Sequence, residues 1–102
     1  MIIGILTVKI SLPLMETIKE KRNVVRSIKD MVRKKFNVSV AEITDNEKLD
    51  NNSIISIVSV SNDINYIKSN LSNIINLIEN HFSSLIVSHN TDILTYKSDK
   101  YN

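Results

Sequence analysis

The chain has 102 residues, of which 42% are hydrophobic and 24% are charged, and its formal net charge is +2. These values are typical of one globular domain, and the length is too short for two domains with separate cores. The absence of cysteine excludes disulfide bonds, thiolate metal sites and cysteine nucleophiles, and it fits a cytoplasmic protein.

The first predicted element is a strand over residues 2–11. Its side chains alternate between two faces, with Leu6 on one face and Ile5 on the other. Although the segment is apolar, it lacks a basic start and a small-residue cleavage site, and charged residues follow too soon for a membrane span. Pro13 ends the strand because it cannot donate a ladder hydrogen bond. We therefore expect a buried strand and no membrane association.

The next predicted element is a helix over residues 17–36. Thr17 and Glu20 match the T-x-x-E capping box, in which the threonine side chain accepts a hydrogen bond from a free backbone N–H. Asn37 is the predicted left-handed cap at the other end. Apolar residues recur at helical spacing and form one face, which consists of Ile18, Val25, Ile28, Val32 and Phe36.

This helix concentrates the positive charge of the chain. Its eight basic residues against Glu20 and Asp30 give a net charge of +6, so the remainder carries −4. Four of the basic residues recur at i, i+4, i+7 and i+11, which places them within an arc of roughly 60° beside the apolar face. Such a row can contact several phosphates, although long cations also commonly solvate the flank of a core helix. The predicted nucleic-acid-binding residues are Lys19, Lys21, Arg22, Arg26, Lys29, Arg33 and Lys34.

Two strands follow the helix. The first is predicted over residues 38–43 and the second over residues 53–61, which is rich in isoleucine and valine. A polar loop over residues 44–52 separates them, and Leu49 is its only apolar residue. This spacing predicts a hairpin.

A second helix and a fourth strand complete the predicted domain. Asn62 or Asp63 caps the helix, and the strand covers residues 85–89, with a possible extension to Leu94. Residues 95–102 are predicted to be a flexible tail. The apolar face of the helix consists of Ile64, Ile67, Leu71, Ile74, Ile75, Ile78 and Phe82.

The element order is therefore β-α-β-β-α-β. With right-handed crossovers, this order predicts an α+β ferredoxin-like sandwich, a four-stranded antiparallel sheet with two helices on one face. We expect one domain over residues 1–94. The predicted core consists of Leu6, Val8, Val25, Ile28, Val32, Val58, Val60, Ile67, Leu71, Ile74 and Ile78.

The open face of this sheet is predicted to be apolar. Its two central strands contain no aromatic residue, so base stacking in the manner of an RRM is not expected there. A contiguous apolar band on neighbouring strands favours a covered surface, and a second copy of the chain is the simplest cover. The predicted homodimer interface consists of Ile3, Ile5, Ile55 and Ile57.

Three segments resemble a known family. They are MIIGILTVKI at the start, IKEKRNVVRSIKDMVRKKFNVSVAEI in the first helix and second strand, and IVSVSND before the second helix. They are similar to the YlxP-like family of bacterial proteins, over roughly residues 1–94. The resemblance implies a ferredoxin-like fold, a cytoplasmic location and an RNA- or ribosome-associated role without an established activity. Leu49 stands where relatives commonly carry an aromatic residue, so a contact that needs this ring is not expected.

No group of residues predicts catalysis. His81 and His89 are the only histidines, and their spacing is more typical of incidental residues than of metal ligands. Residues 11–16 lack the glycine and arginine of an acylphosphatase-like phosphate loop, and also the glycine that an ACT-like amino-acid site usually has in this turn. No nucleophile elbow is present. We therefore expect a binding protein that is not an enzyme and that uses no metal and no cofactor.

Three functional hypotheses follow. The first is a small cytoplasmic accessory protein that binds RNA or a ribosomal particle through the basic edge of the first helix. The second is a homodimeric protein-interaction module with no nucleic-acid ligand, in which the helix charges mainly give solubility. The third is a regulatory domain that binds a small anion near Lys19, Lys21 and Arg22.

Overall fold

The computed structural model describes residues 1–12, 17–43 and 52–97. Leu49 and its loop, Pro13 and the end of the tail lie outside these ranges. The elements follow in the predicted order. They are β1 (Ile2–Ser11), α1 (Ile18–Lys35), β2 (Ser39–Glu42), β3 (Asn52–Ser61), α2 (Ile64–Phe82), the 3-10 turn η1 (Ser83–Leu85) and β4 (Ile86–Thr95).

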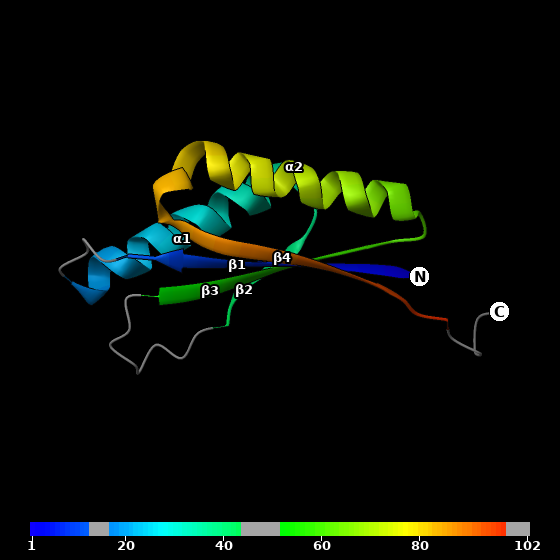
Figure 1. The fold of residues 1–102 in the computed structure, drawn as a ribbon, viewed down its shortest axis with the longest axis horizontal. Coiled ribbons are helices and arrows are strands. Elements are labelled where there is room, and N and C mark those ends of the chain that lie inside the picture. Colours follow the sequence, from blue (N-terminus) through cyan, green and yellow to red (C-terminus); the bar gives the residue numbers. More distant parts are fainter. Residues whose placement is uncertain (13–16, 44–51, 98–102) are drawn as a thin grey trace.

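The four strands form one antiparallel sheet in the order β2-β3-β1-β4. Both helices cover the same face of this sheet, and the opposite face is left without a layer (Figure 1). This confirms the predicted ferredoxin-like sandwich. The central strands are β1 and β3, and the edge strands are β2 and β4.

The core lies between the sheet and the two helices. Gly4 is buried on the helix-facing side of β1, and a Cβ atom added there would lie 2.8 Å from Leu71 Cδ1 and still closer to Ile67 Cγ2. The close approach of α2 to β1 therefore depends on the absence of a side chain at this position. The predicted core residues of β1 and the helices are confirmed as buried, namely Leu6, Val8, Val25, Ile28, Val32, Ile67, Leu71, Ile74 and Ile78.

The structure corrects the predicted faces of β3. Ile55 and Ile57 are fully buried beneath the helices, so they cannot belong to a dimer interface on the open face. Val58 and Val60, predicted in the core, lie on the open face instead, and Val60 is 57% exposed. The register explains this arrangement, because Val58 pairs with Ile5 and Val60 pairs with Ile3.

Hydrogen bonds to two serines allow this face of β3 to be buried. Ser53 and Ser59 lie on the same face as Ile55 and are almost fully buried. The amide of Asn70 on α2 donates to Ser59 Oγ over 3.1 Å, and the Ser53 hydroxyl donates to the carboxylate of Glu42. Because their polar groups are paired, the two serines can be buried at little cost.

The ends of the helices show one confirmed cap and one wrong prediction. Thr17 Oγ1 accepts a hydrogen bond from the Glu20 N–H over 3.1 Å, as the capping box predicts. At the other end, α1 stops at Lys35, and Phe36 already has extended backbone with φ −132°. The Asn37 cap is wrong because the chain passes directly into β2, and no residue within the described ranges has a positive φ. Asp63 caps α2 by accepting from Asn65 and Tyr66.

Strand β4 is longer than residues 85–89 and includes Thr95. Beyond the strand, Tyr96 and Met1 exchange two backbone hydrogen bonds, with N···O distances of 2.8 and 3.1 Å. The ordered ladder therefore continues past residue 94, and only residues 98–102 of the predicted tail lie outside the described ranges. None of the helices in the described part of the chain has the length and apolar character needed to cross a bilayer.

Candidate nucleic-acid interface

The basic flank of α1 faces the edge strand β2. Val25, Ile28 and Val32 anchor the helix on the sheet and are buried. Helical periodicity then places the neighbouring cations beside this apolar face, over the outer part of the sheet. The packing of α1 therefore fixes which edge of the domain is positively charged.

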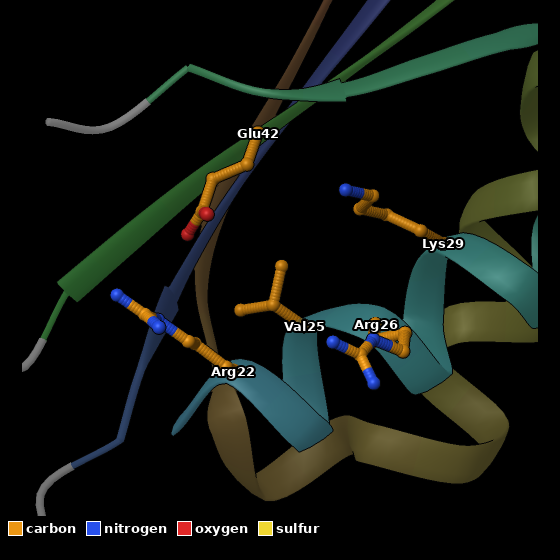
Figure 2. A pocket seen from close by; sticks show the side chains of 5 residues that line it. All are labelled: Arg22, Val25, Arg26, Lys29 and Glu42. Atoms are coloured by element: carbon orange, nitrogen blue, oxygen red, sulfur yellow. The ribbon is translucent and has the colours of Figure 1, made fainter. Parts of the chain in front are cut away.

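A small cleft of about 130 Å³ opens between α1 and β2. Arg22, Arg26 and Lys29 line it from the helix, Val25 forms its apolar floor, and Glu42 enters from β2. Figure 2 shows the Glu42 carboxylate extending from β2 toward the helix, with Arg22 and Lys29 on different sides of Val25. The structure thus brings together three of the predicted binding residues and one acidic residue that the sequence analysis did not assign.

The three cations of the cleft have no ion-pair partner among the residues that the structure describes. Glu42 lies in the same cleft without forming a salt bridge to them, and its carboxylate accepts the hydrogen bond from Ser53. The lining therefore carries three positive charges and one negative charge. This arrangement can hold an anionic group, and the remaining lone pairs of Glu42 can accept a hydrogen bond from a ligand hydroxyl or amino group.

Arg33 differs from the other members of the predicted row. Its Nη2 atom donates to the backbone oxygen of Val40 on β2 over 2.8 Å. This bond holds the last turn of α1 against the sheet edge, which gives Arg33 a structural role. A shallow depression next to it is lined by Asp30, Met31, Arg33 and Lys34.

The remaining predicted cations lie elsewhere on α1. Lys19 is exposed in the first turn, and Lys21 is half-buried. Neither residue lines the cleft between α1 and β2, and Lys34 lines only the shallow depression. The predicted set of seven residues is therefore spread along the helix, and three of them, Arg22, Arg26 and Lys29, line the cleft.

The two histidines do not form a shared site. His89 on β4 pairs with Glu79 on α2, with 3.5 Å between Nε2 and Oε1, whereas His81 donates from Nδ1 to the Leu77 carbonyl over 3.0 Å. Within the described ranges, no three residues of the metal-ligating types gather at one place.

Comparison with known proteins shows the family of the chain. A family described as "Protein of unknown function (DUF503)" matches residues 3–91, which is most of the sequence and nearly the span of the predicted resemblance. This match does not extend to the name YlxP-like. The comparison with curated proteins found no significant match.

Solved structures share the fold over almost their whole length. Protein Atu4242 from Agrobacterium tumefaciens has a TM-score of 0.57 at 10% identity, with 97% of this chain and 96% of that chain covered. The de novo designed protein LFR1, described as having a ferredoxin fold, has a TM-score of 0.55 at 11% identity, with 100% and 92% covered. SnoaB, a cofactor-independent oxygenase from Streptomyces nogalater, has a TM-score of 0.53 at 10% identity, with 99% and 98% covered. At these identities the likeness shows the fold alone.

Proposed function

We propose that this chain, which belongs to the DUF503 family of proteins of unknown function, is a small cytoplasmic accessory protein that binds RNA, free or within a ribosomal particle. The observation that carries the proposal is the cleft between α1 and β2, which Arg22, Arg26 and Lys29 line without ion-pair partners among the described residues. The net charge of +6 on the helix and the resemblance to the YlxP-like family support it. In this proposal the protein binds and does not catalyse.

The chemistry of the cleft favours phosphate contacts along one edge. Arginine presents several N–H donors in a planar fork that matches a phosphate, and each neutralised phosphate releases counterions. Such contacts position a backbone without reading its sequence. The proposal therefore implies weak sequence selectivity and a strong dependence of the affinity on salt.

Glu42 adds a preference for RNA over DNA in this proposal. An ionised carboxylate repels phosphate but accepts hydrogen bonds, and the ribose 2′-hydroxyl is a donor that DNA lacks. The change of Glu42→Gln removes the negative charge and weakens the acceptor. We expect tighter binding of both nucleic acids, and a ratio of DNA Kd to RNA Kd that falls toward one. A ratio that stays constant would remove Glu42 from the recognition of the ribose.

The main test is the removal of positive charge from the cleft. Arg22→Gln, Arg26→Gln and Lys29→Gln together should weaken binding of a single-stranded RNA, measured by fluorescence anisotropy over a range of salt concentrations. Because the triple variant no longer neutralises the three phosphates that these cations would meet, the slope of log K against log salt should become shallower by about 2.

A matched control removes three charges from other surfaces. Lys9, Lys68 and Lys97 are exposed on β1, α2 and the segment after β4, away from the cleft. Changing these three residues to glutamine alters the net charge equally and should leave most of the affinity and the slope intact. Equal losses in the two triple variants would mean that only net charge matters, and the proposed interface would be wrong.

The alternative function is a homodimeric protein-interaction module with no nucleic-acid ligand. One observation favours it: the open sheet face carries an apolar band on neighbouring strands, and Val60 and Leu94 within it are 57% and 51% exposed. Unchanged RNA binding in the cleft variant would favour this alternative. The band consists of Ile3, Ile5, Val58, Val60 and Leu94.

A further inference from the structure

The two edge strands of the sheet differ in length and in how far side chains cover their outer backbone. Edge strand β2 has only four residues, and the Arg33 side chain donates a hydrogen bond to the outward carbonyl of Val40. Edge strand β4 has ten residues, and no other described segment pairs with its outer side. Short length and a charged side chain over the edge are common protections against strand addition, whereas β4 is long, lacks lysine and arginine, and has Asp92 as its one acidic residue.

The backbone groups that β4 leaves unpaired can be identified from the ladder. Tyr96 and Met1 exchange hydrogen bonds, and inward and outward pairs alternate along an antiparallel ladder. Asn90 and Asp92 therefore direct their backbone groups toward β1, whereas His89, Thr91 and Ile93 direct theirs outward. A second strand would meet these outward donors and acceptors.

Proline and basic side chains do not protect this edge. The segment Ile86–Thr95 contains no proline, lysine or arginine. One register shift occurs between Lys9 and Ile10 of β1, so the bulge is confined to the beginning of β4 and the pairing is regular from Ser88 onward. On the helix-facing side, His89 pairs with Glu79 of α2 but stays exposed, as does Thr91, so the helix layer covers this part of the strand only partly.

We infer that two copies of the chain pair antiparallel along β4, about a two-fold axis at Asn90, to form a continuous eight-stranded sheet. The sequence of the strand, IVSHNTDIL over residues 86–94, is symmetric in polarity about this residue. In the regularly paired part of the strand, the polar residues 88–92 would lie beside the same residues of the second copy, whereas the bulge at Val87 places Ile86 opposite Ile10 on the helix-facing side, so Ile86 does not share a face with Leu94. The polar centre of the strand therefore complements its own copy.

Electrostatics favours this register over its neighbours. Asp92 is the one acidic residue of β4, and pairing about Asn90 places it opposite Ser88 of the second copy. The two Asp92 carboxylates are then four positions apart along the strands, about 13 Å. A register centred on Asp92 would place the carboxylates directly opposite each other, which is unfavourable.

The first test uses the absence of native cysteine, so that a single introduced thiol reports one position. In the inferred register Asn90 faces its own copy as a non-hydrogen-bonded pair, with the two Cα atoms about 4.5 Å apart. That distance permits a disulfide. Asn90→Cys should therefore form a covalent dimer under mild oxidation, whereas Asp92→Cys, exposed on the same strand, should not. Equal cross-linking of the two variants would overturn the inference.

The second test removes the outward hydrogen bond of Thr91. Thr91→Pro deletes an N–H that β1 does not use, and proline is tolerated on edge strands. The two-fold axis means that one hydrogen bond is lost in each copy. The dissociation constant of the dimer, measured by sedimentation velocity, should therefore rise at least about tenfold. Thr91→Ala keeps the N–H and should associate as the parent does, and thermal unfolding checks that the proline variant is folded.

Two outcomes would overturn the inference by themselves. One is a parent protein that sediments as a monomer at every concentration. The other is efficient cross-linking of Val60→Cys together with a Thr91→Pro variant that remains dimeric, which would place the contact on the open sheet face. If Thr91→Pro does not fold, the comparison of Asn90→Cys with Asp92→Cys decides whether the two copies pair along β4 in the inferred register.

Discussion

The change of Gly4→Ala tests how closely α2 packs on β1. The added Cβ would lie 2.8 Å from Leu71 Cδ1, and Ile67 Cγ2 would be nearer still. Carbon atoms in ordinary contact are about 3.5–4.0 Å apart, so α2 must shift or the two side chains must leave their rotamers. Overpacking of this kind costs about 1–3 kcal/mol.

The expected net effect is smaller than this cost. Replacing glycine with alanine lowers the conformational entropy of the unfolded chain, which stabilises the folded state by about 0.4–1 kcal/mol. We therefore expect a net destabilisation of about 1–2 kcal/mol, which corresponds to a fall in Tm of roughly 5–15 °C for a domain of this size. Thermal and urea unfolding followed by circular dichroism would measure it.

A double-mutant cycle separates the steric clash from general loss of stability. Ile67→Ala removes the Cγ2 atom that lies nearest the added Cβ, although it leaves a cavity of its own. The double variant Gly4→Ala, Ile67→Ala should lose less free energy of unfolding than the sum of the losses of the two single variants, with a difference on the order of 1 kcal/mol. A Gly4→Ala protein with a raised Tm would refute the close contact between β1 and α2.

Two further predictions concern the sheet edge and the faces of β3. Ile57→Ala should lower the free energy of unfolding by about 2–5 kcal/mol because Ile57 is fully buried, whereas Val60→Ala should change it by less than about 1 kcal/mol because Val60 is 57% exposed. Equal urea midpoints for these two variants would mean that the faces are wrongly assigned. Arg33→Gln should cost about 1 kcal/mol through loss of the bond to the Val40 carbonyl, and Lys34→Gln, its exposed neighbour, should be nearly neutral in the same assay.

Periodicity was sufficient to predict the element order and most of the core. The apolar stripe of α1 and the T-x-x-E start are local signals, and the Thr17 cap and the buried Val25, Ile28 and Val32 follow from them. Each of these features depends on residues within a few positions of one another. Tertiary packing did not override them.

The faces of β3 could not be predicted in the same way. Both faces contain isoleucine or valine separated by serine, so alternation alone leaves the choice open. The buried face carries Ser59, which accepts a hydrogen bond from the buried Asn70 of α2, and this pairing exists only after α2 has packed on the sheet. The cleft has a similar origin, because Glu42 meets the cations only after β2 has packed beside α1.

The two proposals together place the RNA-binding clefts far apart. In a dimer paired along β4, the β2 strands form the two ends of an eight-stranded sheet, seven strand spacings apart. At about 4.8 Å per spacing, the two basic edges are separated by roughly 34 Å. An oligonucleotide too short to span this distance must occupy one cleft, whereas a longer RNA can engage both and gains affinity through effective concentration.

Thr91→Pro should therefore separate the two proposals in one experiment. It lies on β4, away from the residues that line the cleft, so the affinity for a short RNA should equal that of the parent. The affinity for a long RNA should fall toward the short-RNA value, because each monomer then binds alone. Loss of short-RNA binding would instead place Thr91 near the ligand and contradict the α1–β2 site. A variant that dissociates the dimer without changing long-RNA affinity would show that the two edges do not act together, because effective concentration contributes only when both clefts are engaged at once.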